Sequence, residues 1–578
     1  MINALLDRAG RRAVHAHLLA WFGVAPCVAL AQTAPPPPTG GTLLQQLQPS
    51  VPQAPALGNP PPELVAPKAV TAPSSGTGPT VAVKGFRIAG LAAERATPLL
   101  PALQKYVGPA KTLADLEDAA KDVEVALQRQ GLFLAQAYVP EQNLTDGIVT
   151  LQVLPGRIGA VKVEVEPGVK VAPEFMDRIV AILRGNPIAE RELVERALFT
   201  LGDLRGITAT SSLTPGDKVG QADLTVKVSA AKGSAYSYDI DNGGSIFTGR
   251  VRLNGGVEWF NLAGRGDVAS IKAQLTTNGG SQFVRAAWLT PINERGTKLG
   301  LAASFLKYKL GSSLEALDAD GTAAALSVQL LHPLVRSRNS NLFLTSSFDL
   351  RNFDDRVNTL PLKIKKGVTG YFTFGAVGDF RDTFGGGGIS NYSANLVAGK
   401  LKIKTEDEFV LDQSADGFKT NGTYAKIVLT GSRLQVLPNK DYLYFSGSAQ
   451  VSNKNLDSSE KFSLGGPNGV RAYPAPESPS DEGAIVGWEY RKPLSFESMP
   501  GDWVFALFGD YGVGRVHQKA LLGDTSDNTR KLFGHGVGLT YGGANGLIVK
   551  GWVAVRGNTT AQSDDSRTRA YVQLSQQF

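Results

Sequence analysis

Cysteine, histidine and long apolar runs are scarce in this sequence, and each scarcity excludes a class of protein. Cys27 is the only cysteine, and there are five histidines among 578 residues, so we expect neither a disulfide framework nor a Cys/His metal centre. Beyond one stretch near the N-terminus, no run reaches the roughly 20 apolar residues of a membrane helix. The basic residues, with a net charge of +7, form no dense stripe, which argues against nucleic-acid binding.

Catalytic patterns are missing as well. The sequence contains no Ser/His/Asp arrangement, no metal-ligand spacing and no paired carboxylates in a defined context. Two of the five histidines, His15 and His17, lie in the first segment of the chain. We therefore predict that the protein is not an enzyme and that it has no catalytic residues, no metal and no cofactor.

Residues 1–31 predict a secretory signal peptide. Three arginines lie within the first twelve residues, an apolar stretch covers 13–30, and alanines occupy positions 29 and 31. Cleavage before Gln32 fits this pattern and would leave the mature chain without cysteine. The alternative, a single membrane anchor, is disfavoured because the stretch is short and contains Pro26.

Residues 32–79 predict a proline-rich linker. Thirteen of the 33 prolines lie in 35–79, where Glu63 and Lys68 are the only charges, a composition typical of an extended chain. Within it, residues 41–48 (GTLLQQLQ) are long enough for two helical turns before Pro49. So short a helix is stable only when docked against something. The segment is therefore either a docked helix or plain linker.

Two small α+β modules are predicted next, over 80–156 and 157–230. Each follows the order strand, helix, helix, strand, strand. The first module has strands at 81–89, 132–139 and 147–154 and helices at 97–107 and 113–130. The second has strands at 158–165, 207–213 and 222–228 and helices at 173–184 and 189–204.

Two local features of these modules bear on structure and binding. Thr112 and Asp115 form a capping-box-like start for the helix 113–130, and Gly131 ends it. The strand edges of 158–165 and 222–228 are candidate platforms on which an extended peptide could add a strand. The alternative is that these strands only hold the module together.

From 231 to 578 helical periodicity gives way to strict alternation. Val251 and Leu253 fall on one face, whereas Arg252, Asn254 and Glu258 fall on the other. Apolar residues outside and charged residues inside are typical of an outer-membrane barrel, because a soluble barrel turns its apolar face inward. We predict a transmembrane barrel of sixteen antiparallel strands, at 234–242, 248–259, 265–276, 281–291, 297–309, 322–333, 340–352, 367–380, 388–399, 421–434, 440–452, 483–493, 502–513, 532–542, 547–556 and 569–578.

The connections orient this barrel. After even-numbered strands they have four to eight residues, whereas after odd-numbered strands they reach 21 (400–420), 30 (453–482) and 18 residues (514–531). Short turns face the periplasm in outer-membrane barrels, so both α+β modules are expected in the periplasm. The aromatic C-terminus, Phe578, resembles the signal that the barrel-assembly machinery reads.

Two short motifs in the last third of the chain belong together. The loop motif consists of Val470, Arg471, Ala472 and Tyr473, inside 453–482. The inner-wall motif consists of Phe508, Asp510 and Gly512, which alternation places opposite the aromatic outer face of strand 502–513.

An aspartate on the inner wall needs a cationic partner or water, and Arg471 is the candidate partner of Asp510. Their pairing would fold the long loop into the barrel and act as a loop–barrel latch. The alternative is an ordinary lumen salt bridge. Inward-facing Gly534, Gly536 and Gly538 on the next strand would leave room for the loop.

The order of these parts resembles the two-partner secretion (type Vb, TpsB) transporters, typified by the hemolysin- and filamentous-hemagglutinin-secreting outer-membrane proteins. The resemblance covers essentially the whole mature chain, with the α+β modules as polypeptide-transport-associated (POTRA) modules. Local matches are 41–48 (plug helix), 138–142 with Gly147 and Val149 (end of the first POTRA module), 241–249 (first hairpin), 470–473 (loop motif) and 508–512 (inner-wall motif). Ala472 stands where the family usually has glycine.

The resemblance implies a function and a set of partners. The POTRA modules would recognise a large exoprotein of hemolysin or adhesin type in the periplasm, and the barrel would export it without ATP to the cell surface or medium. The other partners would be outer-membrane lipid and the barrel-assembly machinery that inserts the transporter itself. A single closed barrel is expected to work as a monomer.

Three other functions were weighed. An outer-membrane assembly factor of the same superfamily shares the loop motif, but such factors usually carry three or more POTRA modules and no plug helix. A passive porin would leave the two periplasmic modules without a purpose. An outer-membrane enzyme would need the catalytic patterns that the sequence lacks.

Overall fold

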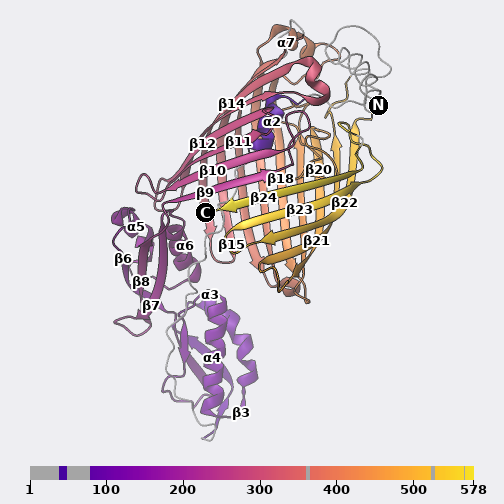
Figure 1. Cartoon of the computed structure of the whole chain (residues 1–578). Helices are drawn as coiled ribbons and strands as arrows, with labels where there is room; N and C mark the ends of the chain where they lie inside the picture. Colours follow the sequence, from indigo (N-terminus) through magenta and orange to yellow (C-terminus); the bar gives the residue numbers. More distant parts are fainter. Residues whose placement is uncertain (1–37, 49–78, 186, 360–364, 522–526, 565) are drawn as a thin grey trace.

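The computed structural model describes residues 38–48, 79–185, 187–359, 365–521, 527–564 and 566–578. The predicted signal peptide and most of the predicted linker lie outside these ranges. Two α+β modules form an arm below one end of a large barrel, and a short helix lies inside the barrel (Figure 1). Among the described residues, no helix is long and apolar enough to cross a membrane.

The first module contains two small sheets and one long helix. Its elements are β1 (Val81–Val83), β2 (Gly85–Ala89), α3 (Ala93–Ala96), η1 (Thr97–Tyr106), β3 (Gly108–Lys111), α4 (Leu113–Arg129), β4 (Gln136–Tyr138) and β5 (Ile148–Leu154). The sheet orders are β2-β5-β4 and β1-β3. The capping box of Thr112 and Asp115 is present at the start of α4.

The helix predicted at 97–107 is present as the 3₁₀ helix η1. Pro101 lies inside this helix and has no N–H to donate to the preceding turn, which prevents a regular α-helix there. The strand expected at 132–139 is also shorter, since Phe133 and Leu134 pack into the core of the second module instead.

The second module has one three-stranded sheet covered by helices. Its elements are β6 (Arg157–Val165), α5 (Pro173–Val180), η2 (Ala181–Leu183), α6 (Arg191–Gly202), β7 (Ile207–Pro215) and β8 (Gln221–Ala230). The strand order is β6-β8-β7. The prediction of a free edge at 222–228 was therefore wrong, because β8 is hydrogen-bonded on both sides, to β6 in parallel and to β7 antiparallel.

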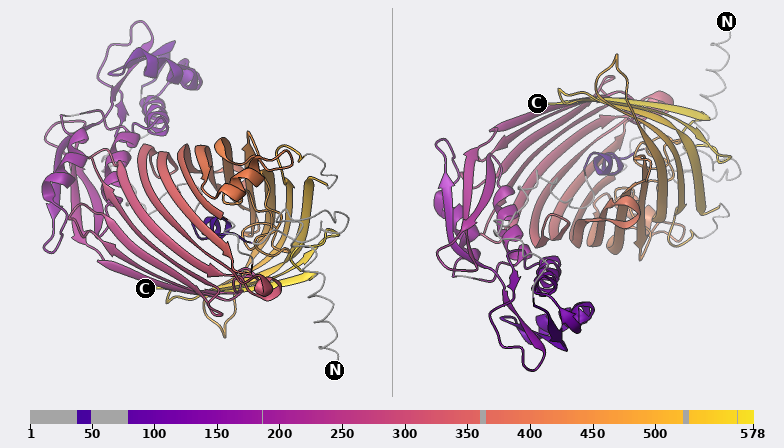
Figure 2. Two further views of the ribbon diagram at one scale, coloured as in Figure 1. Left: turned by 90° about the horizontal axis from the view of Figure 1, so that it is seen from above. Right: turned by 90° about the horizontal axis from the view of Figure 1, so that it is seen from below.

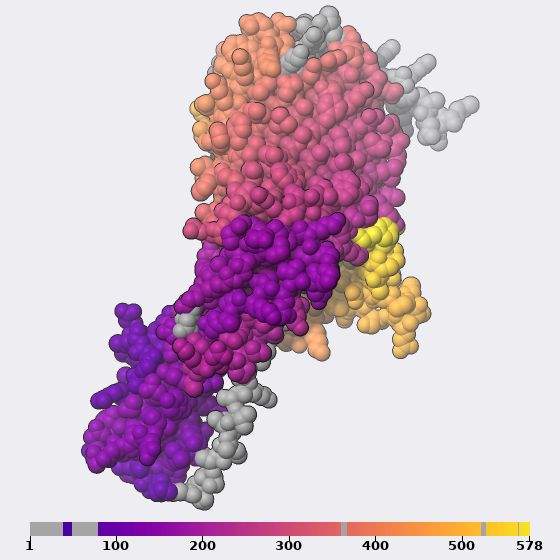
Figure 3. All heavy atoms as spheres, turned by 90° about the vertical axis from the view of Figure 1, so that its left-hand side faces the viewer, coloured from indigo at the N-terminus to yellow at the C-terminus, as the bar shows by residue number. Residues whose placement is uncertain are grey.

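Specific contacts join the two modules of the arm to each other and the second module to the barrel. The backbone N–H of Arg191 in the second module donates to the carbonyl of Gly131 in the first, 2.8 Å away. At the barrel, Arg336 donates two hydrogen bonds to the carboxylate of Asp203 at the end of α6, of 3.0 and 2.6 Å. Figure 3 shows the second module seated against the barrel and the first module extending beyond it.

Sixteen antiparallel strands, β9 to β24, close into one barrel, as predicted. They are β9 (Ser234–Asp241), β10 (Arg252–Phe260), β11 (Val268–Thr276), β12 (Ser281–Pro291), β13 (Lys298–Lys309), β14 (Ala319–Arg336), β15 (Ser340–Val357), β16 (Lys365–Asp382), β17 (Gly388–Ile403), β18 (Gly422–Val436), β19 (Tyr442–Ser452), β20 (Glu482–Leu494), β21 (Asp502–Arg515), β22 (Thr529–Gly542), β23 (Leu547–Arg556) and β24 (Thr568–Gln577).

The two faces and two ends of the barrel differ as the alternation and loop lengths indicate. Outward Phe372 and Phe374 are 62% and 60% exposed, whereas inward Asp510 is 4% exposed. Turns on the side of the arm run from three residues (337–339) to seven (495–501), but a loop of 29 residues, 453–481, leaves the other side. The short helices η3 (Ser312–Leu317), η4 (Phe384–Gly386) and α7 (Glu406–Gln413) were not anticipated.

Candidate functional site

The loop 453–481, here called loop L6, folds back into the barrel. Its residues Leu464, Val470 and Tyr473 are completely buried, which is unusual for a surface connection because buried backbone must find hydrogen-bond partners. The helix α2 (Gly40–Leu47) lies beside it in the lumen, inside the ring of strands in both views along the barrel (Figure 2). The candidate site consists of this loop, this helix and the wall they touch.

Arg471 at the tip of loop L6 contacts Asp510 of β21 through three donors. Its Nε and Nη2 lie 2.8 and 2.7 Å from the two carboxylate oxygens, and its backbone N–H lies 3.1 Å from one of them. Its Nη1 donates to Glu489 of β20, and its guanidinium stacks 3.6 Å from the ring centroid of Phe508. Such a bidentate, stacked arrangement uses the planar geometry that distinguishes arginine from lysine.

The structure therefore brings the loop motif and the inner-wall motif together. Each predicted residue has a defined neighbour. Val470 packs against Gly512, because a Cβ on this glycine would lie only 2.9 Å from a methyl group of the valine. The hydroxyl of Tyr473 donates to the carbonyl of Thr559, 2.9 Å away, and Tyr571 of β24 donates to the carbonyl of Tyr473, 3.1 Å away.

The three glycines of β22 do not share one role. A Cβ on Gly534 would lie 2.5 Å from the methyl of Ala472, so this glycine makes room for the loop. A Cβ on Gly536 would strike the ring of Phe508 at 2.6 Å, and the three atoms nearest a Cβ on Gly538 belong to β21 and β23, not to the loop. Ala472 itself is absent from the residues with positive φ in the described chain, so an alanine fits there without backbone strain.

Two further charged anchors hold loop L6. Glu460, 3% exposed, pairs with Arg351 of β15 at 3.5 Å and with Lys426 of β18 at 2.9 Å. Lys461 pairs with Asp481 at 2.6 Å and donates to the carbonyl of Val516 at 2.6 Å. Glu460 thus fixes one flank of the loop to the wall, and Lys461 ties that flank to the end of the loop at Asp481.

Helix α2 is docked between loop L6 and the wall. Its N-cap Thr39 shares a 2.8 Å hydrogen bond with Ser458 of the loop, and the N–H of Gly40 donates to Asp355 of β15 at 3.0 Å. Leu43 and Leu44 pack with apolar wall residues, among them Phe283 of β12. Gly41 approaches the loop so closely that a Cβ would lie 2.4 Å from that of Ser459.

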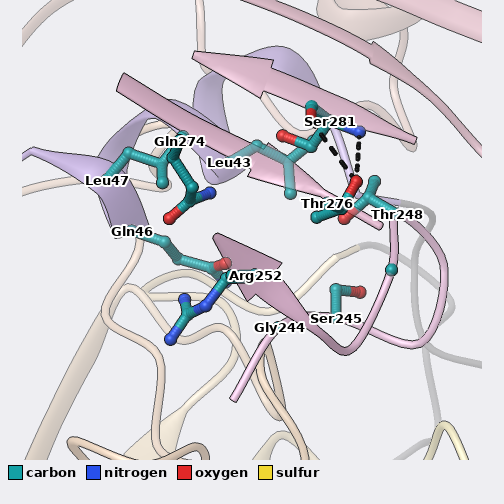
Figure 4. A pocket seen from close by; sticks show the side chains of 11 residues that line it. Leu43, Gln46, Leu47, Gly244, Ser245, Thr248, Arg252, Gln274, Thr276 and Ser281 are labelled. Carbon is teal, nitrogen blue, oxygen red and sulfur yellow. Dashed lines mark hydrogen bonds between the residues drawn. The ribbon is translucent and has the colours of Figure 1, made fainter. Parts of the chain in front are cut away.

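On its other side α2 leaves only a narrow gap to the wall. Figure 4 shows Gln46 and Leu47 facing Arg252 and Gln274 across this space. Its volume is about 20 Å³, enough for one water molecule. Helix and loop together therefore fill this part of the lumen.

Sequence reasoning missed two of the anchors. Glu489 was not predicted as a partner of Arg471, although its inward alternation and its position on the strand next to Asp510 were both readable. Glu460 lies in a loop without periodicity, so no sequence signal pairs it with Arg351 and Lys426. Buried ion pairs of this kind depend on the fold to bring distant segments together.

Comparisons with known proteins agree with this architecture. The model of the haemolysin secretion/activation protein family ShlB/FhaC/HecB matches residues 220–541, and that of the ShlB-type POTRA domain matches 81–156. The chain is 27% identical over 457 residues to the heme/hemopexin transporter protein HuxB of Haemophilus influenzae, covering 78% of this chain and 79% of that one. It is 22% identical over 448 residues to the outer membrane transporter CdiB of Dickeya dadantii, covering 75% of each.

Solved structures show the same fold. CdiB from Escherichia coli is similar with a TM-score of 0.67 at 18% identity, over 89% of this chain and 94% of that one. CdiB from Acinetobacter baumannii is similar with a TM-score of 0.60 at 15% identity, over 93% and 96%.

The family match covers more than half of the chain and includes most of the barrel, and the predicted fold class, function and location are confirmed. The chain belongs to the haemolysin secretion/activation family ShlB/FhaC/HecB, the outer-membrane transporters of two-partner secretion that carry POTRA domains in the periplasm and export an exoprotein partner.

Proposed function

We propose that this transporter exports one large exoprotein of hemolysin or adhesin type through its own barrel, and that loop L6 and helix α2 hold the barrel closed between export events. The observation that carries the proposal is the set of polar contacts that hold α2 in the lumen. Hydrogen bonds such as Thr39–Ser458 and Gly40–Asp355 can be exchanged for water or for a passing chain at small net cost.

Capture of the partner is assigned to the arm. In the described residues the outer edge of β6 carries no neighbouring strand, so an extended segment of the partner can add to it through backbone hydrogen bonds. Ion-paired Lys162 and Glu164 on this strand keep the edge from pairing indiscriminately, as charged residues do on other edge strands.

Opening begins with helix α2. Eight residues do not form a stable helix alone in water, so α2 stays folded only through contacts such as those of its Leu43 and Leu44 with the wall. A partner segment that binds in the same part of the lumen therefore displaces α2, which unfolds as it leaves. Binding of the partner is the only energy source that this step requires.

Arg471 and Asp510 act as the latch of loop L6. Their pair is shielded from water, with the two side chains 15% and 4% exposed. Breaking such a pair by removing one partner is strongly unfavourable, because it leaves a buried charge without compensation. The latch thus keeps the tip of the loop on β21 while the rest of the lumen changes.

Secretion of the partner tests this proposal. The transporter is expressed in a surrogate Gram-negative host with the large exoprotein encoded beside it, and the medium and cell surface are probed for that exoprotein. Arg471→Ala and Asp510→Ala, checked for barrel insertion by heat-modifiable gel mobility, should reduce export. If the exoprotein stays in the periplasm with the wild-type transporter, while loss of the transporter depletes other outer-membrane barrels, the assembly function replaces the one proposed here.

A further inference from the structure

The wall of the lumen nearest the arm carries cations that have no ion-pair partner. Lys272 of β11 and Arg285 of β12 are direct cross-strand partners on the inward face. Among the described residues the structure records no salt bridge for either of them. Like charges directly opposite each other in a sheet repel and are destabilising. The need for a hydrophilic wall accounts for a single inward cation, but it does not account for two cations directly opposite each other.

Arg285 of this cationic pair lines a cavity at the mouth of the barrel. The cavity has a volume of about 270 Å³ and lies between the end of α6 in the second module and the strands β10 to β14. Arg285 lines it together with Arg205 and Lys298. In Figure 1 the strands β10 to β12 run down to the side of the barrel where α6 is seated. A chain handed from the module to the lumen passes this cavity.

The acidic residues nearby form no ion pair with Lys272 or Arg285 in the described chain, and two of them are engaged by other groups. Asp203 is engaged by Arg336 in two hydrogen bonds, and Asp349 accepts hydrogen bonds from Ser327 and Ser347. Glu258 lines the cavity, yet no ion pair joins it to a cation of the described chain. Three cations, Arg205, Arg285 and Lys298, thus line the cavity beside two carboxylates, and an excess of one sign of charge attracts ligands of the other sign.

The position of Arg285 links this cavity to helix α2. Arg285 lies opposite Ser304 of β13, and Ser304 accepts a hydrogen bond from Gln48, the residue that ends α2. An anionic group drawn to Arg285 therefore arrives beside the end of the helix that fills the lumen.

We propose that Lys272, Arg285 and Arg205 form a docking site for acidic side chains of the unfolded partner as it passes from the second module into the barrel. This proposal rests on the export function proposed above. Arginine and lysine bind carboxylates through charge-assisted hydrogen bonds, and an unfolded chain presents such groups without the need for a folded surface. The cavity lies between the second module and the lumen, on the way from one to the other, so the ligand proposed for it is a segment of the partner polypeptide.

Peptide binding to the full-length transporter in detergent tests the site directly. Three fluorescein-labelled decapeptides are compared by fluorescence anisotropy, one glutamate-rich, one with glutamine in place of each glutamate, and one with lysine. The glutamate peptide should bind best. The double variant Lys272→Gln/Arg285→Gln should raise the Kd for that peptide by about tenfold, and high salt should abolish the difference between the variant and the wild type. Lys550→Gln, an inward lysine on β23, is the matched control and should bind as the wild type does.

Two results would overturn the site. One is equal binding of the three peptides, or an unchanged Kd in the double variant. The other is complete competition by inorganic phosphate at millimolar concentration, which would define a site for small anions only. Export by the surrogate host separates the two proposals: if the wild type and the double variant export equally, the docking site fails while the transport function stands, and if the wild type does not export, the transport function fails.

Discussion

The methyl group of Ala472 in loop L6 lies directly against the α-carbon of Gly534 on β22, so that a Cβ on the glycine would come within 2.5 Å of it. The family usually has glycine at the loop position, and here the space for an alanine is supplied by the wall. The fit between these two residues sets how deeply the tip of loop L6 sits in the barrel.

Gly534→Ala should therefore impair export, and Ala472→Gly in the same chain should restore it. The single variant forces a contact that costs about 1–3 kcal/mol in a packed site, whereas the double variant removes one of the two clashing methyls. The measurement is secretion together with the melting temperature of the barrel. Equal defects in the single and double variants would show that the contact does not matter.

Asp510→Asn should damage export and stability more than Glu489→Gln. Asp510 accepts three hydrogen bonds from Arg471, but Glu489 accepts one. Loss of the carboxylate leaves Arg471 buried with its main counter-charge missing, a change worth about 3–5 kcal/mol. Thermal unfolding followed by gel mobility ranks the two variants, and the reverse order would assign the latch to Glu489.

Gly41→Ala should open the channel. The substitution favours the helix itself by about 1 kcal/mol, but its Cβ would lie 2.4 Å from that of Ser459, so a better helix should dock less well. The expected result is a larger conductance in planar bilayers. Gln46→Ala changes an exposed position of the same helix and should leave conductance as it is, which separates docking from helix propensity.

Asp203→Asn should loosen the second module from the barrel without unfolding either part. Asp203 belongs to the second module and forms an ion pair with Arg336 of β14, whose side chain is 4% exposed. The neutral amide keeps the shape but loses the charge-assisted bidentate pair. Limited proteolysis and hydrogen exchange at the turn 337–339 should increase. Asp177→Asn, a surface carboxylate of the same module paired with Arg184, is the control and should change neither.

The sequence predicted the barrel well because lipid imposes a rule at every second residue. A strand such as β21 must turn its aromatic residues outward and Asp510 inward, and the same rule in all sixteen strands made their number readable. The pairing of Arg471 with Asp510 was also within reach, since one residue lay in a long loop and the other on an inner wall.

Other features depended on three-dimensional contacts that leave no local pattern. The anchor at Glu460 depends on side chains from β15 and β18 that both reach this residue inside the barrel. No sequence pattern in 453–481 predicts these ion pairs. The central place of β8 follows from parallel pairing with β6, which strand propensity does not specify.

The hydrogen bonds between Thr39, Thr42 and Ser458 have a thermodynamic consequence. Helix α2 and loop L6 each bind better when the other is in place, so their affinities for the lumen are linked and the linkage is reciprocal. A substitution in loop L6 that never touches α2 must then change how readily α2 dissociates, by the same factor with which loss of α2 loosens the loop. The docking of α2 and loop L6 is therefore a cooperative equilibrium, and a substitution in either segment shifts its midpoint.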